Sequence, residues 1–395
     1  MVPKEKTCLG DYFISSREKG RAKLPLLSVT LNNGIVQRSD LERRTETNIS
    51  PEEHLFVKEG DIVYNMMRVW QGALGRANTD GMVSPAYIVL RPNKNVNSTY
   101  TEYLFNTKKM IYMFWAYSYG ITNDRLRLYF NDFKRIPVTL PCIAEQNAIA
   151  KILSIWDQTI TINEKILKCN RLQKIALTQQ LLTGKYRFPE FKQKWQNTLL
   201  NDIYSFKKGK DLSKSDLVEE GTRCILYGEL YTKYDEVISI VHSKTKSEAG
   251  LISRSGDILI PASTTTSGID LANATAVLED GILLGGDINV LRPKKYLNAP
   301  FMAHLLTHIK KHEIASKAQG ITIIHLYGKD LQSINVLIPT DIDEQNKIAT
   351  VLTNANRKIQ TLQAKITCLK QEKKALMQQL LTGKRRVKVD AVEAS

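Results

Sequence analysis

The sequence predicts an α+β protein in which two mixed globular domains alternate with two long helices that pair as an antiparallel coiled coil. Two observations predict this fold class: a helical segment that occurs twice, and a heptad pattern of apolar residues along both copies. The length and composition agree, because 395 residues with 43% hydrophobic and 24% charged side chains suit several domains with their own cores.

The repeated segment covers residues 145–187 and recurs, without gaps, as residues 344–386. Of its 43 positions 19 are identical, and both copies contain the run Gln-Gln-Leu-Leu-Thr-Gly-Lys near their ends. The chain is therefore a tandem repeat of a globular part followed by a helix. Four shorter motifs that precede the first helical segment are repeated before the second one. They are Gly60–Val63 with Gly256–Leu259, Leu90–Pro92 with Leu291–Pro293, Gly120–Thr122 with Gly320–Thr322, and Ile136-Pro137 with Ile338-Pro339.

The heptad is clearest in the second copy, where positions 348 to 380, spaced alternately four and three apart, hold nine apolar residues and one lysine. The equivalent positions of the first copy, 149 to 181, hold seven apolar residues in the same register. This spacing forms the seam of a coiled coil. Neither copy contains Pro or Gly before its closing Thr-Gly, so each is predicted to be one helix that stops at Gly184 or Gly383. Because a single helix cannot bury its own apolar seam, the two helices are expected to pair through their seams.

The repeat divides the chain into four predicted parts. These are a first globular domain (1–136), a first helical spacer (137–187), a second globular domain (188–337), and a second helical spacer with a C-terminal tail (338–395). Runs rich in β-branched residues between turn residues predict strands at 60–65, 84–90, 256–261 and 286–291. Helices are predicted at 100–116 and 299–311.

The charge balance indicates a polyanionic partner. The chain carries 56 Lys+Arg against 40 Asp+Glu, a net charge of +16, which suits nucleic acid or an anionic membrane. No apolar run approaches the roughly 20 residues of a spanning helix. The N-terminus lacks the apolar stretch of a signal peptide, and the five cysteines form no CxxC pair. A cytoplasmic protein that binds nucleic acid rather than a membrane is therefore predicted.

The common catalytic motifs are absent from the sequence. No Gly-Lys is followed by Ser or Thr as in a phosphate-binding loop, and no [DN]PP[YF] or PD…(D/E)xK pattern occurs. No catalytic or cofactor-binding residue is therefore predicted. His304, His308 and His312 share one face of a predicted helix, but Leu305 breaks the HExxH pattern of zinc proteases. A solvent-facing histidine stripe is expected rather than a metal site, so none is predicted.

These features together resemble the specificity subunits of type I restriction–modification enzymes. The resemblance covers nearly the whole chain and rests on the tandem halves, the Ile-Pro…Glu-Gln entry to each helix, the shared Gln-Gln-Leu-Leu-Thr-Gly-Lys endings and the Gly-Asp-Ile strand openings. The linker Arg187–Phe191 also fits.

The resemblance implies that each globular part is a target recognition domain for one half of a bipartite double-stranded DNA sequence. It implies that the paired helices set the spacer between the half-sites and dock two modification (methyltransferase) subunits. Those partners would hold S-adenosylmethionine, and restriction subunits would supply ATP- and Mg-dependent translocation and cleavage, so this chain would be non-catalytic and hold no cofactor. The 38 residues from 145 to 182 would form a helix of about 57 Å, or about 17 base pairs of duplex.

Basic side chains in predicted loops are the candidate DNA contacts, since arginine and lysine bind phosphates and the edges of guanine. An ordinary exposed charge is the alternative for each. Two other functions also remain open: a DNA-independent coiled-coil scaffold, and a stand-alone DNA-modifying enzyme. The candidates are Arg68, Arg76, Arg125 and Arg127 in the first domain, and Lys207, Lys208, Lys210, Lys244, Lys246 and Arg254 in the second.

Overall fold

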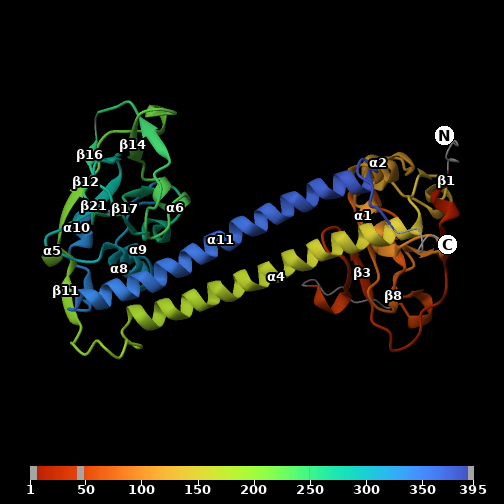
Figure 1. The fold of residues 1–395 in the computed structure, drawn as a ribbon, viewed down its shortest axis with the longest axis horizontal. Helices are drawn as coiled ribbons and strands as arrows, with labels where there is room; N and C mark the ends of the chain where they lie inside the picture. Colours follow the sequence, from red (N-terminus) through yellow and green to blue (C-terminus); the bar gives the residue numbers. More distant parts are fainter. Residues whose placement is uncertain (1–6, 42–48, 249, 390–395) are drawn as a thin grey trace. The chain divides into compact units, whose positions relative to one another are not determined.

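A computed structural model describes residues 7–41, 49–248 and 250–389, so both ends of the chain, including the end of the predicted C-terminal tail, lie outside the described residues. The chain forms two compact units, here called the first unit (Met1–Ile162 with Ile366–Ser395) and the second unit (Asn163–Lys365). Each unit holds one mixed globular domain and parts of both long helices (Figure 1). The α+β class with two globular domains and two long helices is confirmed.

The core of the first unit is a four-stranded antiparallel sheet with the strand order β2-β9-β6-β7. In β6, Ile62 and Tyr64 pack toward the helices, while Val63 packs toward a second layer of short strands. Both faces of the sheet are thus covered, which explains why the first three residues of β6, Ile62 to Tyr64, are all buried and hydrophobic. The elements are β1 (Thr7–Cys8), β2 (Phe13–Ser16), β3 (Leu27–Thr30), β4 (Gly34–Gln37), β5 (Leu55–Val57), β6 (Ile62–Asn65), β7 (Leu74–Arg76), β8 (Gly81–Val83), β9 (Tyr87–Pro92), β10 (Pro137–Val138), α1 (Ser98–Phe105), α2 (Lys108–Ala116) and α3 (Phe130–Phe133).

The second unit repeats this sheet with the order β12-β21-β17-β19, again antiparallel throughout. Ile258 and Ile260 of β17 face one core, and Leu259 faces another that includes a five-stranded sheet. The strands are β11 (Gln196–Leu199), β12 (Tyr204–Lys208), β13 (Leu217–Val218), β14 (Thr222–Ile225), β15 (Ser243–Thr245), β16 (Leu251–Ile252), β17 (Ile258–Pro261), β18 (Ser263–Thr264), β19 (Thr275–Ala276), β20 (Leu283–Leu284), β21 (Ile288–Pro293), β22 (Ile324–His325) and β23 (Asn335–Ile338). The short helices are α5 (Leu200–Ile203), α6 (Glu229–Thr232), α7 (Gly268–Leu271), α8 (Ala299–His304), α9 (Lys311–Ser316) and α10 (Gly328–Leu331).

The two long helices are α4 (Ile143–Leu182) and α11 (Ile342–Leu381). Each is uninterrupted, as predicted, and 40 residues long. Gly184 and Gly383, just beyond their ends, adopt the left-handed conformation of a helix stop, with φ of +69° and +73°. Every predicted seam position is buried or half-buried. In the first unit Asp157 pairs with Lys373 and Glu145 with Arg386. In the second unit Arg171 donates to Gln363 and Arg187 pairs with Glu344. In both units the number of the paired residue rises as the number along α4 falls, so the helices run antiparallel. Coiled-coil packing along their full length stays a prediction.

The two predicted shorter helices are interrupted. The segment predicted as 100–116 breaks between α1 and α2, where the Thr107 hydroxyl accepts from the Met110 backbone and starts a new helix. The segment predicted as 299–311 becomes α8, a π-helical turn (Leu305–Ile309) and α9. Apolar periodicity continued through both breaks, which is why the sequence predicted single helices.

The repeated Gly-Asp-Ile and Leu-Arg-Pro motifs form an ion pair in each unit. Arg91 of β9 donates to both carboxylate oxygens of Asp61, just before β6, at 3.3 and 3.1 Å. In the second unit Arg292 of β21 does the same to Asp257, at 2.9 and 2.7 Å. The paired strands β6–β9 and β17–β21 bring these residues together. Two of the repeated motifs upstream of the helices are therefore the two halves of an ion pair within each central sheet.

The Glu-Gln motif at each helix start binds the arginine that follows the other helix. Glu145, in the first turn of α4, accepts two hydrogen bonds from Arg386. Glu344, in the first turn of α11, accepts two from Arg187 at 2.8 and 2.7 Å, and one from Trp195. Both glutamates are buried. These reciprocal pairs join one helix end to the other helix start inside each unit.

Candidate nucleic-acid interface

Three of the predicted arginines of the first unit gather at one end of the central sheet. Arg68 follows the end of β6, and its side chain is exposed. The Leu128 backbone N–H donates to the Met66 carbonyl at 2.9 Å, which holds the loop of residues 119–127 beside that strand end. Arg125 and Arg127 are exposed on this loop. The structure therefore places Arg68, Arg125 and Arg127 around the same edge.

Arg76 lies apart from these three arginines. In the antiparallel pair β6–β7 it stands opposite Ile62, at the start of β6, and so at the other end of the strand from Arg68. Its guanidinium donates to Asn78 at 2.5 Å and lies 3.9 Å from the half-buried Glu102 carboxylate. Burial raises the pKa of Glu102, while a backbone hydrogen bond from Arg76 and the charge of Arg76 oppose that rise. Arg76 therefore lies away from the sheet end that carries Arg68, and a DNA contact by either arginine stays a prediction.

In the second unit, three lysines follow the equivalent sheet end. Lys207, Lys208 and Lys210 are exposed at the end of β12. The Lys208 ammonium lies 3.3 Å from the carboxylate of Asp287, just before β21. Ser263, beyond the end of β17, donates to the other oxygen of Asp287 at 3.0 Å. The same end of the sheet is thus lined by charged and hydroxyl side chains.

A hollow of about 830 Å³ opens beside these lysines. Its walls include Lys208, Tyr227 and Tyr231, so cationic and aromatic side chains share one concave surface. Three other lining residues, Asp211, Leu212 and Asp287, are non-glycine residues with left-handed φ of +46°, +52° and +57°. Such backbone strain concentrates at functional sites. The two tyrosines were not predicted as site residues, because nothing in their local sequence indicates that they lie beside Lys208.

The remaining candidates of the second unit do not line this hollow. Lys244, half-buried on β15, stands opposite Arg223 of β14, and Lys246 lies just beyond that strand. Arg254 precedes β17, at the opposite end from Ser263, and its backbone N–H donates to Asp257 at 2.8 Å. None of these three residues is therefore part of the wall that Lys208 shares with the two tyrosines.

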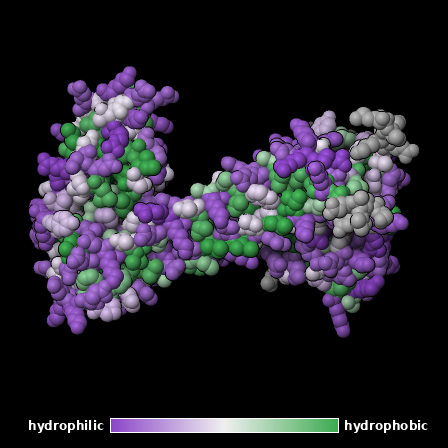
Figure 2. Space-filling model, in the orientation of Figure 1, coloured by the Kyte–Doolittle hydropathy of each residue, from purple (hydrophilic) through white to green (hydrophobic). Residues whose placement is uncertain are grey.

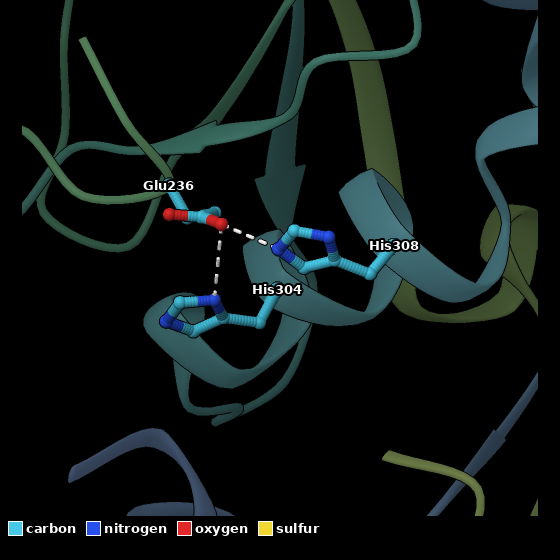
Figure 3. A group of neighbouring side chains, drawn as sticks. All are labelled: Glu236, His304 and His308. Carbon is cyan, nitrogen blue, oxygen red and sulfur yellow. Dashed lines mark hydrogen bonds and ion pairs between the residues drawn. The ribbon is translucent and has the colours of Figure 1, made fainter. Parts of the chain in front are cut away.

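The expected solvent-facing histidine stripe is wrong. His304, the last residue of α8, is completely buried, and His308, in the π-helical turn that follows, is half-buried. Both face the loop that holds Glu236. Figure 3 shows both imidazoles directed at one oxygen of the Glu236 carboxylate. His308 Nε2 lies 2.5 Å from that oxygen and His304 Nδ1 lies 3.5 Å from it. His312, beyond the break, is exposed.

Two residues of the long helices complete this cluster. The Lys174 ammonium of α4 lies 3.0 Å from the same carboxylate oxygen, and Asn356 of α11 donates to the other oxygen. Burial acts to raise the pKa of Glu236, but the two histidines and the Lys174 charge outweigh burial and hold the pKa well below its usual range. The ammonium already neutralises the carboxylate, so the group is an ion-pair cluster that ties the second domain to both helices.

The comparisons with known proteins agree with this architecture. A model of the type I restriction modification DNA specificity domain matches the chain twice, over residues 9–169 and 192–371. The type I restriction enzyme MjaVIII specificity subunit of Methanocaldococcus jannaschii is 24% identical over 85% of this chain and 81% of its own length. The putative MjaX specificity subunit of that organism is 26% identical over 76% of this chain and 71% of its own.

A solved structure shares the fold. The S subunit of a type I restriction-modification system from M. genitalium superposes with a TM-score of 0.58 at 16% identity, covering 96% of this chain and 97% of its own. Because the family model covers most of the sequence in two copies, the chain belongs to the type I restriction–modification DNA specificity family. Among the residues that the structure describes, no helix has both the length and the apolar character of a membrane span.

Proposed function

We propose that this chain is the sequence-specific DNA-binding subunit of a type I restriction–modification complex, and that each unit reads one half of a bipartite double-stranded target. One observation carries the proposal: both units build the same antiparallel sheet and place basic side chains at the same end of it. In the first unit these are Arg68, Arg125 and Arg127. In the second they are Lys207, Lys208 and Lys210, beside the hollow with its two tyrosines. Such side chains bind phosphates and base edges.

The proposal assigns α4 to the docking of two modification subunits. Among the described residues, five large apolar side chains are exposed on α4 and none on α11. Figure 2 shows hydrophobic surface along the long helices, between hydrophilic side chains. An amphipathic partner helix buries such residues in a helix bundle. The exposed residues are Ile155, Ile162, Ile166, Leu172 and Ile175.

The chemistry belongs, in this proposal, to the partner subunits. The modification subunits would bind S-adenosylmethionine, and restriction subunits would bind ATP and Mg, while this chain supplies the choice of target. The absence of a phosphate-binding loop and of methyltransferase motifs from the sequence supports this division. A protein that selects DNA targets works beside the genome, so the proposal places it in the cytoplasm.

Replacing Arg68 by alanine tests the proposal. We expect the purified complex with modification subunits to bind its target more weakly, and the slope of log affinity against log salt to fall by about one if Arg68 contacts a phosphate. Methylome sequencing of cells that express the variant should show methylation that is reduced, or relaxed in one half of the target only. Arg135→Ala, at another exposed arginine of the first unit, is the control and should change neither result.

The same measurement separates the alternatives. A complex whose affinity for duplex DNA does not change with salt would support a DNA-independent scaffold and contradict the proposal. DNA methylation or cleavage by the purified chain with S-adenosylmethionine or magnesium alone would instead support a stand-alone enzyme.

We also expect the length of the helices to set the spacer between the half-sites. Inserting one helical turn into both α4 and α11 at equivalent positions keeps the seam of each helix close to register, since a turn holds 3.6 residues. The insertion should lengthen the unspecified spacer of the methylated sequence by about one to two base pairs, because one turn adds about 5.4 Å. An unchanged spacer in the methylome of such a strain would contradict this role.

A further inference from the structure

Each unit carries one isoleucine that is almost fully exposed at the tip of a loop. Ile121 in the first unit is 93% exposed and Ile321 in the second is 99% exposed. They are the middle residues of the repeated Gly-Ile-Thr motif, so they occupy equivalent positions in the two domains. The flanking glycine and threonine are the same in both domains, whereas the residues on either side of the motif differ, Tyr119 and Asn123 in the first domain against Gln319 and Ile323 in the second. The two domains therefore expose a large apolar side chain to water at equivalent positions.

The loops that carry these isoleucines are closed and shaped by backbone contacts. Tyr119 and Arg127 exchange two backbone hydrogen bonds, of 3.1 and 3.0 Å, at the base of the first loop. Gln319 and His325 exchange two, of 2.9 and 2.7 Å, at the base of the second. A buried leucine follows each base and donates its N–H to the segment just after the central strand. Both tips therefore project from a fixed base.

The glycine before each isoleucine is required by the loop. A Cβ at Gly120 would lie 2.4 Å from the Arg125 carbonyl oxygen, and a Cβ at Gly320 would lie 2.1 Å from that of Ile323. Gly320 also has a φ of +125°, which disfavours other residues. Each loop thus folds tightly back on itself directly before its isoleucine, and this turn leaves the side chain without intramolecular cover.

The surroundings of the tips carry positive charge and aromatic rings. The first loop exposes two cations, Arg125 and Arg127, and one anion, Asp124, and the Tyr119 and Tyr129 rings lie 5.5 Å apart at its base. In the second unit the Lys329 ammonium lies over the Tyr327 ring, beyond the loop. No acidic residue occurs from 314 to 329. A polyanion fits this combination better than an apolar protein surface does, since protein interfaces bury broad apolar areas rather than one side chain.

We infer that Ile121 and Ile321 are apolar wedges that insert at a base step of each half-site and unstack it. Proteins that bend DNA insert isoleucine, leucine or phenylalanine in this way, with cationic side chains on the adjacent phosphates. A wedge reads no base sequence, so two domains with different targets can share it, whereas base-reading residues must differ. The inference deepens the proposed function and rests on it: each recognition domain opens the stack at its own half-site as it binds.

The test uses the complete complex of this chain with its modification subunit and a duplex whose sequence is read from the methylome. In that duplex 2-aminopurine, which brightens when unstacked, replaces successive purines of each half-site. We expect binding to raise the fluorescence at one step in each half-site. Ile121→Ser should abolish the rise in one half-site only and Ile321→Ser in the other only, each with about tenfold weaker DNA binding. The matched variants Ile121→Leu and Ile321→Leu should keep both signals.

Three results decide the matter. If the serine variants lose the modification subunit in size-exclusion chromatography but keep the fluorescence change, the tips contact protein and the inference fails. If wild type binds its target specifically and neither serine variant changes affinity or fluorescence, the inference fails while the proposed function stands. If wild type shows no preference for the methylated sequence over an unrelated duplex, the proposed function itself fails. Both isoleucines are exposed, so unchanged melting temperatures should accompany every variant.

Discussion

Replacing Asp257 by alanine should lower the unfolding free energy of the second unit by about 3–5 kcal/mol, the cost of breaking a buried ion pair by removing one partner. Asp257 is 0% exposed and Arg292 only 10% exposed, so the guanidinium would stay buried without its counter-charge. Hydrogen bonding to Asp257 raises the pKa of Arg292 in the native protein. A guanidinium stays charged even without that partner, so the variant would hold an unpaired cation. The Arg254 backbone N–H would also lose its acceptor. Hydrogen–deuterium exchange resolves the loss unit by unit.

The equivalent change in the first unit is the matched comparison. Arg91 is 31% exposed and also lies 3.4 Å from Glu18, so after Asp61→Ala it keeps both water and a second carboxylate. The loss should therefore be smaller, about 1–3 kcal/mol. The double variant Asp257→Ala with Arg292→Met should recover part of the stability of the second unit, because it removes the unpaired charge. Equal destabilisation by Asp61→Ala and Asp257→Ala would contradict the argument from burial.

The second large effect is expected from Arg187→Ala, at the junction between the end of α4 and the start of α11. Glu344 is 1% exposed, and among the described residues the Trp195 indole is the side-chain donor that its carboxylate would keep without Arg187. We expect a loss of about 2 kcal/mol, within the range for a hydrogen bond to a charged group, because Arg187 itself is partly in water. Chemical denaturation and the rate of proteolysis in residues 183–195 measure it.

Arg187→Lys is the informative control for that prediction. Lysine keeps the charge but not the two parallel hydrogen bonds that the guanidinium makes, so an intermediate loss is expected. The reciprocal variant Arg386→Ala should destabilise the first unit in the same way, because it leaves the buried Glu145 with the Val387 backbone N–H. A variant at either arginine that unfolds like wild type would show that the reciprocal pairs contribute no stability.

Local regularity made part of this fold predictable. The heptads, the Pro- and Gly-free runs and the closing Thr-Gly depend only on residues a few positions apart, and the structure has α4 and α11 where they indicated. The strands β6, β9, β17 and β21 were also predicted, with bounds that differ by a few residues. The breaks between α1 and α2, and between α8 and α9, were missed because apolar periodicity continues through them.

The candidate site was predicted less well. Arg68 and Arg76 are eight residues apart in sequence, yet the β6–β7 pairing places them at opposite ends of a strand. The reverse holds for Glu236 and His308, which are 72 residues apart and meet only through the packing of a loop against a π-helical turn. The spacing of residues in the sequence indicates which side chains share a face of one helix or strand. It does not indicate which side chains of other elements will contact them.

The sequence by itself determined the tandem plan, the two long helices and the family of this protein, because repetition and periodicity are properties of the chain alone. It also marked Gly-Asp-Ile, Leu-Arg-Pro, Glu-Gln and Gly-Ile-Thr as repeated, without saying why. Only the tertiary structure decided that the first three motifs supply residues of two kinds of ion pair and that the fourth exposes an isoleucine. The physical reason is that the partner of a charge, or the cover of an apolar side chain, comes from residues distant in sequence. Only the packing of the folded chain brings those residues close.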